Sequence, residues 1–260
     1  MNTGLSASMQ RRLFWRSLCM QACWSFERMQ SFGFVYCIEP WLQRCYGAQP
    51  EALREAQQRH SEFFNTQPHM ASLVIGMTCA LEESAAGSSG EEKADKVARL
   101  RALKAAAAAA LAGLGDALFW GALRPFCAAL ALAGAMAFAR RSIWLAAIWS
   151  AAAYLAAYDL PALALRWGFL RLGYEWKDQI AVRLRDWPGQ KTIRYLRWGG
   201  SLLALGACGL MLWAVPGPLR GLAALGVAAT VGLKVLQVSA YKLYVSAALI
   251  GTIAAWAGWL

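Results

Sequence analysis

The sequence is poor in charge and in the side chains that most often carry out catalysis. Charged residues make up 16% of its 260 residues, and histidine occurs only at His60 and His69. A soluble domain carries about a quarter charged residues, so this composition argues against a soluble protein. Neither histidine has neighbours at the spacing of metal ligands, and we predict no metal site.

Cysteine pairs and nucleic-acid motifs are also missing. The seven cysteines include no CxxC pair, so we interpret them as reduced apolar side chains rather than as disulfides or metal ligands. No histidine or cysteine lies beside a suitable base, so we expect neither a catalyst acting on its own nor a cofactor. The net charge of +11 fits basic cytoplasmic loops better than nucleic-acid binding.

The sequence instead has long apolar runs and many tryptophans. Hydrophobic residues make up 58% of the chain, and its 13 tryptophans are typical of membrane interfaces. Eight Lys or Arg residues against three acids make the stretch 166–197 cytoplasmic by the positive-inside rule. The runs that we predict as membrane spans are 111–125, 125–139, 142–158, 199–216, 219–233 and 243–260. Asp159 and Pro161 are expected to interrupt the chain after the third run.

The N-terminal part has a different pattern. Met9 to Gln30 reads as one amphipathic helix, with apolar residues on one face: Trp15, Cys19, Ala22, Phe26 and Met29. Such a helix can lie in the headgroup plane, or it can pack against the protein's own membrane helices. Both arrangements remain open at this point.

A helical hairpin is predicted next. Pro50 suits the first turn of a charged helix that continues to Phe64, and Thr66 can cap a second, apolar helix from Met70 to Leu81. Twelve residues cannot cross about 30 Å of hydrocarbon, so we interpret this helix as a re-entrant or broken membrane element. The alternative is a surface helix in which the two glutamates that follow it are solvated. The predicted organisation is therefore an N-terminal amphipathic and cytoplasmic helical region over 1–100, with a multi-span region over 101–260. The fold class is an all-α polytopic membrane protein with broken or re-entrant helices.

One carboxylate, Asp116, lies in the middle of the apolar segment LAGLGDALFWGALRP. A carboxylate at membrane depth is costly and usually faces a cavity, a partner or a substrate. Arg124 lies eight residues further on, and we predict an intramembrane ion pair between the two. Direct contact of Asp116 with a ligand is the competing interpretation.

Four blocks of the chain resemble the IID component of the mannose/fructose/sorbose-type sugar phosphotransferase system (PTS). They are LFWRSLCMQACWSFERMQSFGFVY, HSEFFNTQPHMASLVIGMTCALEE, LAGLGDALFWGALRP and DLPALALRWGFLRLGY. The resemblance implies a multi-pass subunit of the bacterial cytoplasmic membrane that carries no phosphorylated residue of its own. It implies that this subunit and a IIC subunit together bind a hexose and carry it inward, in a homotrimer of IIC–IID pairs. A separate cytoplasmic IIAB protein would then phosphorylate the sugar.

Two of these blocks contain the side chains that suit a sugar. Carboxylates and amides bond neighbouring hydroxyls, and an aromatic ring can cover the C–H face of the sugar. The candidate substrate-binding residues are Asn65, Glu82, Glu83, Asp116 and Trp120. We expect Asn65 and one of the glutamates to bond the sugar or to line its cavity, whereas Trp120 has the weakest claim.

The sequence also departs from the pattern of the family it resembles. Gln67 stands where the family usually has a histidine, and the alanine run 105–110 stands where it usually has a Gly-Pro break. These departures leave open a diverged membrane sensor or scaffold that binds a IIC-like partner without transport. A third interpretation is a membrane enzyme that uses Glu82, Glu83 and Asp116 on a metal or a lipid substrate.

Overall fold

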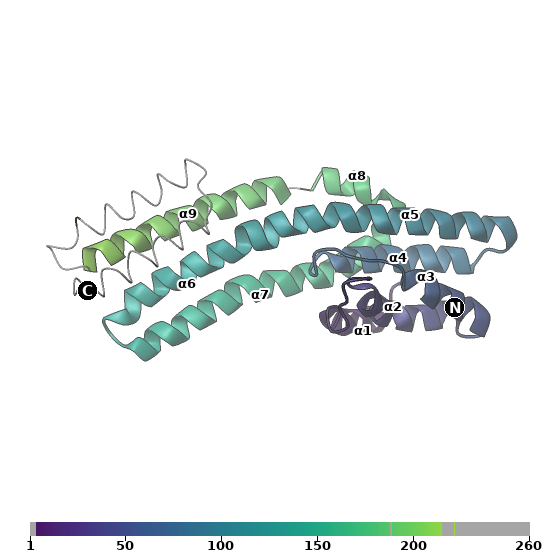
Figure 1. Ribbon diagram of the computed structural model, residues 1–260, viewed down its shortest axis with the longest axis horizontal. Helices are drawn as coiled ribbons and strands as arrows, with labels where there is room; N and C mark the ends of the chain where they lie inside the picture. Colours follow the sequence, from purple (N-terminus) through teal and green to yellow (C-terminus); the bar gives the residue numbers. More distant parts are fainter. Residues whose placement is uncertain (1–3, 188, 215–220, 222–260) are drawn as a thin grey trace. The chain divides into compact units, whose positions relative to one another are not determined.

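The computed structural model describes residues 4–187, 189–214 and 221, and its named elements in this part of the chain are all helices, as the sequence predicts (Figure 1). The chain divides into two compact units, Met1–Leu203 and Ala204–Leu260. Apart from residue 221, the predicted spans 219–233 and 243–260, and the end of 199–216, lie outside the described residues. The helices are α1 (Ala7–Leu18), α2 (Ser31–Tyr46), α3 (Pro50–His60), α4 (Ala71–Ala86), α5 (Gly90–Gly115), η1 (Asp116–Leu123), α6 (Arg124–Ala139), α7 (Ile143–Trp176), η2 (Lys177–Gln179), α8 (Ile180–Arg185) and α9 (Gly189–Ala214).

Two helices in the described part of the chain are long and apolar enough to cross a membrane. The first runs without a break through α5, η1 and α6 over Gly90–Ala139, and the second covers Ile143–Arg185. Figure 1 shows α6 and the first part of α7 as an antiparallel pair that extends away from α1–α4, whereas the last part of α7 packs against α4. The predicted boundary at residue 100, between the N-terminal region and the multi-span region, falls inside α5. It remains a prediction about membrane topology.

The interruption predicted at Asp159 and Pro161 is wrong, because α7 continues through both residues. An interior proline removes a single backbone hydrogen bond, and membrane helices tolerate such a loss where neighbouring helices support them. Helix α7 has this support, since it packs against both α4 and α6. The runs 111–125 and 125–139, which we predicted as separate spans, belong to one continuous helix, in which Pro125 lies in the first turn of α6 directly after the π-helical segment η1.

The single N-terminal helix predicted from Met9 to Gln30 is also wrong. Helix α1 ends at Leu18, and residues 19–30 form turns. The chain turns here to lie against α2: the carbonyl oxygen of Met20 is 1.7 Å from the place where a side chain at Gly33 would begin. Trp15 on α1 and Phe26 in the turns after it are 65% and 85% exposed, so these two aromatic side chains do not pack against the protein's own helices in the described part of the chain.

Helix α4 is the centre of the N-terminal core. Twelve of its sixteen residues are buried, and it crosses α7 where each helix has a glycine. A side chain at Gly76 would begin 2.1 Å from the carbonyl oxygen of Leu170, and one at Gly173 would begin 2.1 Å from that of Leu73. Glycine allows this close approach of two backbones. An apolar helix that is covered on nearly all sides acts as a core element rather than a surface helix.

Helix α4 also differs from its predicted boundaries. It does not end before Glu82 and Glu83 but continues to Ala86, so it has sixteen residues rather than twelve. The helix passes Glu82 because the partners described below neutralise this carboxylate in the core. Helix α3 is shorter than predicted and ends at His60 instead of Phe64.

Candidate functional site

Glu82 lies in a buried cluster that joins α2, α3 and α4. Arg59 donates two hydrogen bonds to its carboxylate, from Nε to Oε1 and from Nη2 to Oε2, both of 2.7 Å. Tyr46 donates its hydroxyl to Oε2 at 2.7 Å, and His60 Nε2 lies 2.6 Å from Oε1. The side chains of Glu82 and His60 are fully buried, and that of Arg59 is 5% exposed.

The protonation states in this cluster follow from burial and hydrogen bonds. Burial by itself would raise the pKa of Glu82, but the hydrogen bonds from Arg59 and His60 lower this pKa to about 2. Burial lowers the pKa of His60 to about 4, so its ring is neutral at pH 7. His60 Nε2 then donates to Glu82, and its Nδ1 accepts from Lys104 Nζ at 3.3 Å. We assign this tautomer from the two partners.

Lys104 brings α5 into the same cluster. Its ammonium lies 4.4 Å from the centre of the Phe34 ring and 5.3 Å from that of Phe64, and the side chain is almost fully buried. Cation–π contacts of this kind stabilise a charge that has lost its water. The cluster therefore fastens four helices together around Glu82.

The two predicted glutamates have protein partners in the structure. Both oxygens of Glu82 are occupied, so this carboxylate is placed to hold the fold together rather than to meet a sugar hydroxyl. Glu83 is partly exposed, accepts a hydrogen bond from the Tyr174 hydroxyl and lies 3.4 Å from Arg44. The alternative in which both glutamates are solvated is wrong for Glu82.

Asn65 lies in the loop 64–70, which is tightly held although Asn65 itself is exposed. The Gln30 amide bonds both backbone groups of Thr66, at 2.8 and 3.1 Å. The side-chain oxygen of Gln67 accepts from the backbone N–H of His69 and of Met70, at 2.7 and 3.1 Å. Gln67 thus holds the turn that precedes α4. The cap that we predicted for Thr66 is absent, because α4 has no side-chain cap bond and the Thr66 hydroxyl is buried without a partner in the described part of the chain.

The same loop packs against the segment that contains Asp116. A side chain at Gly115 would begin 2.5 Å from Gln67 Cβ, so glycine is needed for this contact. The His69 ring lies 4.6 Å from the Phe119 ring, and His69 Nε2 lies 3.5 Å from the Tyr158 hydroxyl. The fold therefore brings Asn65 and Asp116 onto neighbouring elements.

Asp116 begins the π-helical segment η1, which ends at Leu123. Such wide helical turns are rare and often mark functional sites. Asp116 is exposed and Trp120 is 45% exposed, so both present polar or aromatic groups at the surface of a membrane-length helix.

The predicted ion pair between Asp116 and Arg124 is absent from the described part of the chain. Asp116 and Arg124 lie about two helical turns apart, which is too far for the short aspartate side chain. Arg124 instead places its guanidinium 5.1 Å from the Trp120 ring, four residues before it.

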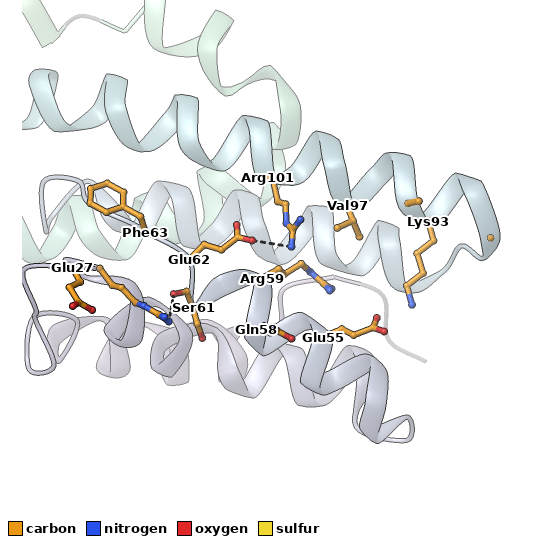
Figure 2. A pocket seen from close by; sticks show the side chains of 13 residues that line it. Glu27, Glu55, Gln58, Arg59, Ser61, Glu62, Phe63, Lys93, Val97 and Arg101 are labelled. Carbon is orange, nitrogen blue, oxygen red and sulfur yellow. Dashed lines mark hydrogen bonds and ion pairs between the residues drawn. The ribbon is translucent and has the colours of Figure 1, made fainter.

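Two hollows lie beside the cluster. The larger, of about 900 Å³, lies between α3 and the first half of α5, and Figure 2 shows Arg101 reaching from α5 to Glu62, with 3.0 Å between them. Its lining contains both arginines and glutamates, so its charge selects no single class of ligand. The smaller, of about 200 Å³, is lined by Asn65, Lys104 and the Glu62–Arg101 pair among others.

Sequence reasoning missed the partners of Glu82. Arg59 and His60 precede Glu82 by more than twenty residues and lie on a different helix, across a loop. Helical spacing along the chain therefore could not predict their contact with Glu82. The available signal was compositional: the block that holds Glu82 also begins with a histidine. Within the described ranges no group of three histidine, cysteine or acidic side chains is arranged to hold a metal.

Comparisons with known proteins assign the chain to a family. Residues 4–212 match the family model for the PTS system mannose/fructose/sorbose family IID component. The mannose-specific EIID component of Escherichia coli (strain K12) is 34% identical over 208 residues, which cover 80% of this chain and 68% of that protein. The sorbose-specific EIID component of Klebsiella pneumoniae is 30% identical over 200 residues, which cover 77% of this chain and 67% of that protein.

A solved structure agrees with this assignment. A chain in the structure of the mannose transporter ManYZ with microcin E492 is 28% identical, with a TM-score of 0.58 and 98% of each chain covered. The family match, the sequence identity and the helical membrane architecture point to the same conclusion. This chain belongs to the mannose/fructose/sorbose family of PTS IID components, which are membrane proteins.

Proposed function

We propose that this chain is the IID subunit of a sugar permease that pairs with a IIC subunit, binds a hexose and moves it into the cell. The observation that carries this proposal is the exposed carboxylate of Asp116 in a π-helical turn of a membrane-length helix. Such a group is stable at membrane depth only beside a partner, water or a polar substrate. The relatives support the substrate class, because their names specify mannose and sorbose.

Within this function we assign the exposed groups to the sugar and the buried groups to the support behind it. Asn65, Asp116 and Trp120 remain the proposed contacts, since the described structure leaves these side chains exposed on adjoining elements. Glu82 and Glu83 hold together the helices behind these contacts. IIC is then expected to supply the other wall of the site.

The remaining parts of the proposal concern assembly and place. The chain would cross the bacterial cytoplasmic membrane several times, with the basic segment 166–197 on the inner side. A cytoplasmic IIAB protein would phosphorylate the released sugar, and IIC–IID pairs would assemble as trimers. Movement of one helical bundle against another around a midplane site would give alternating access.

The test measures hexose binding to the IIC–IID complex in proteoliposomes. We expect Asp116→Asn and Asn65→Ala each to weaken binding at least about tenfold, because each removes a group that bonds a desolvated hydroxyl. Asp95→Asn is the matched control, since Asp95 is an exposed carboxylate at the charged start of α5. Unchanged affinity of both site variants, in complexes that still assemble, would remove these residues from the sugar site.

One observation favours the alternative of a sensor or scaffold. The alanine run 105–110 continues α5 without a break, where the family pattern leads us to expect a hinge. The π-helical segment directly after α5 weakens this argument, because it supplies an irregular turn close by. A chain that forms the complex with IIC and binds hexose, yet supports no uptake, would establish the alternative.

A further inference from the structure

A second polar site lies on α9 and contains none of the residues assigned to the sugar. Arg194, Arg197, Trp198 and Ser201 follow one another at helical spacing, so they share one face of the helix. These residues line a hollow of about 260 Å³ in the described part of the chain. All four belong to the unit Met1–Leu203, and all four are exposed.

The hollow is strongly cationic. Neither Arg194 nor Arg197 takes part in an ion pair within residues 4–187 and 189–214. Two guanidiniums and a hydroxyl group thus face one small space without a carboxylate in its described lining. Arginine binds phosphate through two parallel N–H donors, and it does so better than lysine.

One of the two arginines is already oriented by the fold. Arg197 Nε donates to the carbonyl oxygen of Gly121 in η1 at 3.3 Å. Its Nη2 lies 3.3 Å from the place where a side chain at Gly121 would begin. A side chain that is fixed before its ligand arrives loses less entropy on binding, which strengthens the site.

The aromatic residues favour a position of this hollow at a membrane surface. Trp198 and Tyr195 are 67% and 71% exposed, and the predicted apolar span 199–216 begins directly after Trp198. Tryptophan and tyrosine collect at the headgroup level, and arginines next to a span on the inner side attract anionic lipids. A soluble anion would need no such aromatic neighbours.

We propose that this hollow binds the phosphate of an anionic phospholipid headgroup, with Arg194 and Arg197 as its ligands and Trp198 in the interfacial layer beside it. Ser201 donates its hydroxyl to the same phosphate. The site lies outside the proposed sugar contacts, so it adds a lipid requirement to the subunit rather than restating its transport role.

The test is native mass spectrometry of the full-length chain, purified from membranes with any partner that copurifies, and titrated with phosphatidylglycerol or phosphatidylcholine. We expect Arg194→Gln/Arg197→Gln to weaken phosphatidylglycerol binding about tenfold. The matched control is Arg183→Gln/Arg185→Gln, which removes the same charge from the neighbouring helix α8. This control should bind phosphatidylglycerol within about twofold of the parent chain.

Each outcome of the titration decides the proposal. Equal weakening in both double variants, or equal binding of the two lipids by the parent chain, overturns it. Competition by millimolar inorganic phosphate without any lipid preference identifies a free-anion site instead.

If Arg194→Gln/Arg197→Gln does not fold, Arg194→Lys/Arg197→Lys replaces it. Unchanged lipid binding by this lysine variant would then refute the role of the two guanidinium groups. Hexose binding measured on the same samples reports separately on the proposed function.

Discussion

Replacing Glu82 with glutamine should destabilise this protein far more than the same change at its neighbour Glu83. Glutamine keeps the shape of Glu82 but removes the negative charge, and the guanidinium of Arg59 then remains buried without the carboxylate that it bonds. Removing one partner of a buried ion pair costs about 3–5 kcal/mol. Glu83 is partly exposed and its pair with Arg44 spans 3.4 Å, so Glu83→Gln should cost less than about 1 kcal/mol.

The magnitude can be checked against the protonation of the cluster. Glu82 has its pKa lowered from 4.5 to about 2, which corresponds to about 3 kcal/mol of stabilisation of the charged form in the folded state. This value agrees with the lower end of the cost of breaking the pair. The cost of breaking the ion pair and the lowered pKa have the same structural cause: four hydrogen bonds of at most 2.7 Å reach the carboxylate of Glu82.

The assay is chemical unfolding of the purified chain in detergent, followed by circular dichroism, for the parent and each variant. A double-mutant cycle with Arg59→Gln should show strong coupling: the double variant should lose about 1–3 kcal/mol less than the sum of the single variants. Equal free energies of unfolding for Glu82→Gln and Glu83→Gln would refute this reasoning. Additivity of the Arg59 and Glu82 changes would refute it as well.

Three further predictions concern the same framework. Burial lowers the pKa of His60 to about 4, so below pH 6.5 the unfolded chain binds a proton at this residue that the folded chain does not. His60 should therefore contribute a loss of stability of about 3 kcal/mol between pH 7 and pH 4, and burial of His69 adds to the loss in the same pH range. His60→Gln should make the slope of stability against pH less steep in denaturant titrations at several pH values. Gly173→Ala should lower the thermal unfolding midpoint by several degrees, because the added methyl group would meet the α4 backbone. The control Gly168→Ala lies on the same helix with nothing within 4 Å and should be neutral or stabilising. Similar midpoints for the two variants would contradict the close crossing of α4 and α7. Gln67→Ala should cost about 1 kcal/mol and speed hydrogen exchange at the amides of His69 and Met70, because it removes two hydrogen bonds of the turn before α4. Unchanged protection of these amides would exclude this role of Gln67.

The sequence allowed the fold class to be predicted because membrane composition is a strong signal. Low charge, many tryptophans and long apolar runs indicate a helical membrane protein before any single helix is placed. Boundaries were less predictable, because tertiary contacts decide them. Helix α1 ends early so that Met20 can pack against Gly33, and α7 passes Pro161 because α4 and α6 support it.

The candidate site was only partly predictable for a related reason. Some candidate residues could be identified from the sequence because they are polar or aromatic groups within an apolar segment or a loop. These are Asn65, Asp116 and Trp120. The partners of Glu82 could not be identified in this way, because Arg59 and His60 belong to a charged helix that reads as solvated. Only the folding of α3 onto α4 turns those two residues inward, and no spacing rule along the chain describes that contact.

The described structure combines a rigid part with a deformable one, and the two meet at Gly115. On the rigid side, the Glu82 cluster and the paired glycines of α4 and α7 fix the loop 64–70 in place. On the deformable side, η1 has a wide turn whose carbonyl at Gly121 is bonded by Arg197. Ordinary α-helix resists bending, whereas a π-helical turn lets a helix change direction at low cost. We therefore expect movement during transport to be taken up in Asp116–Leu123 while α4 stays fixed, so that Asp116 moves relative to Asn65.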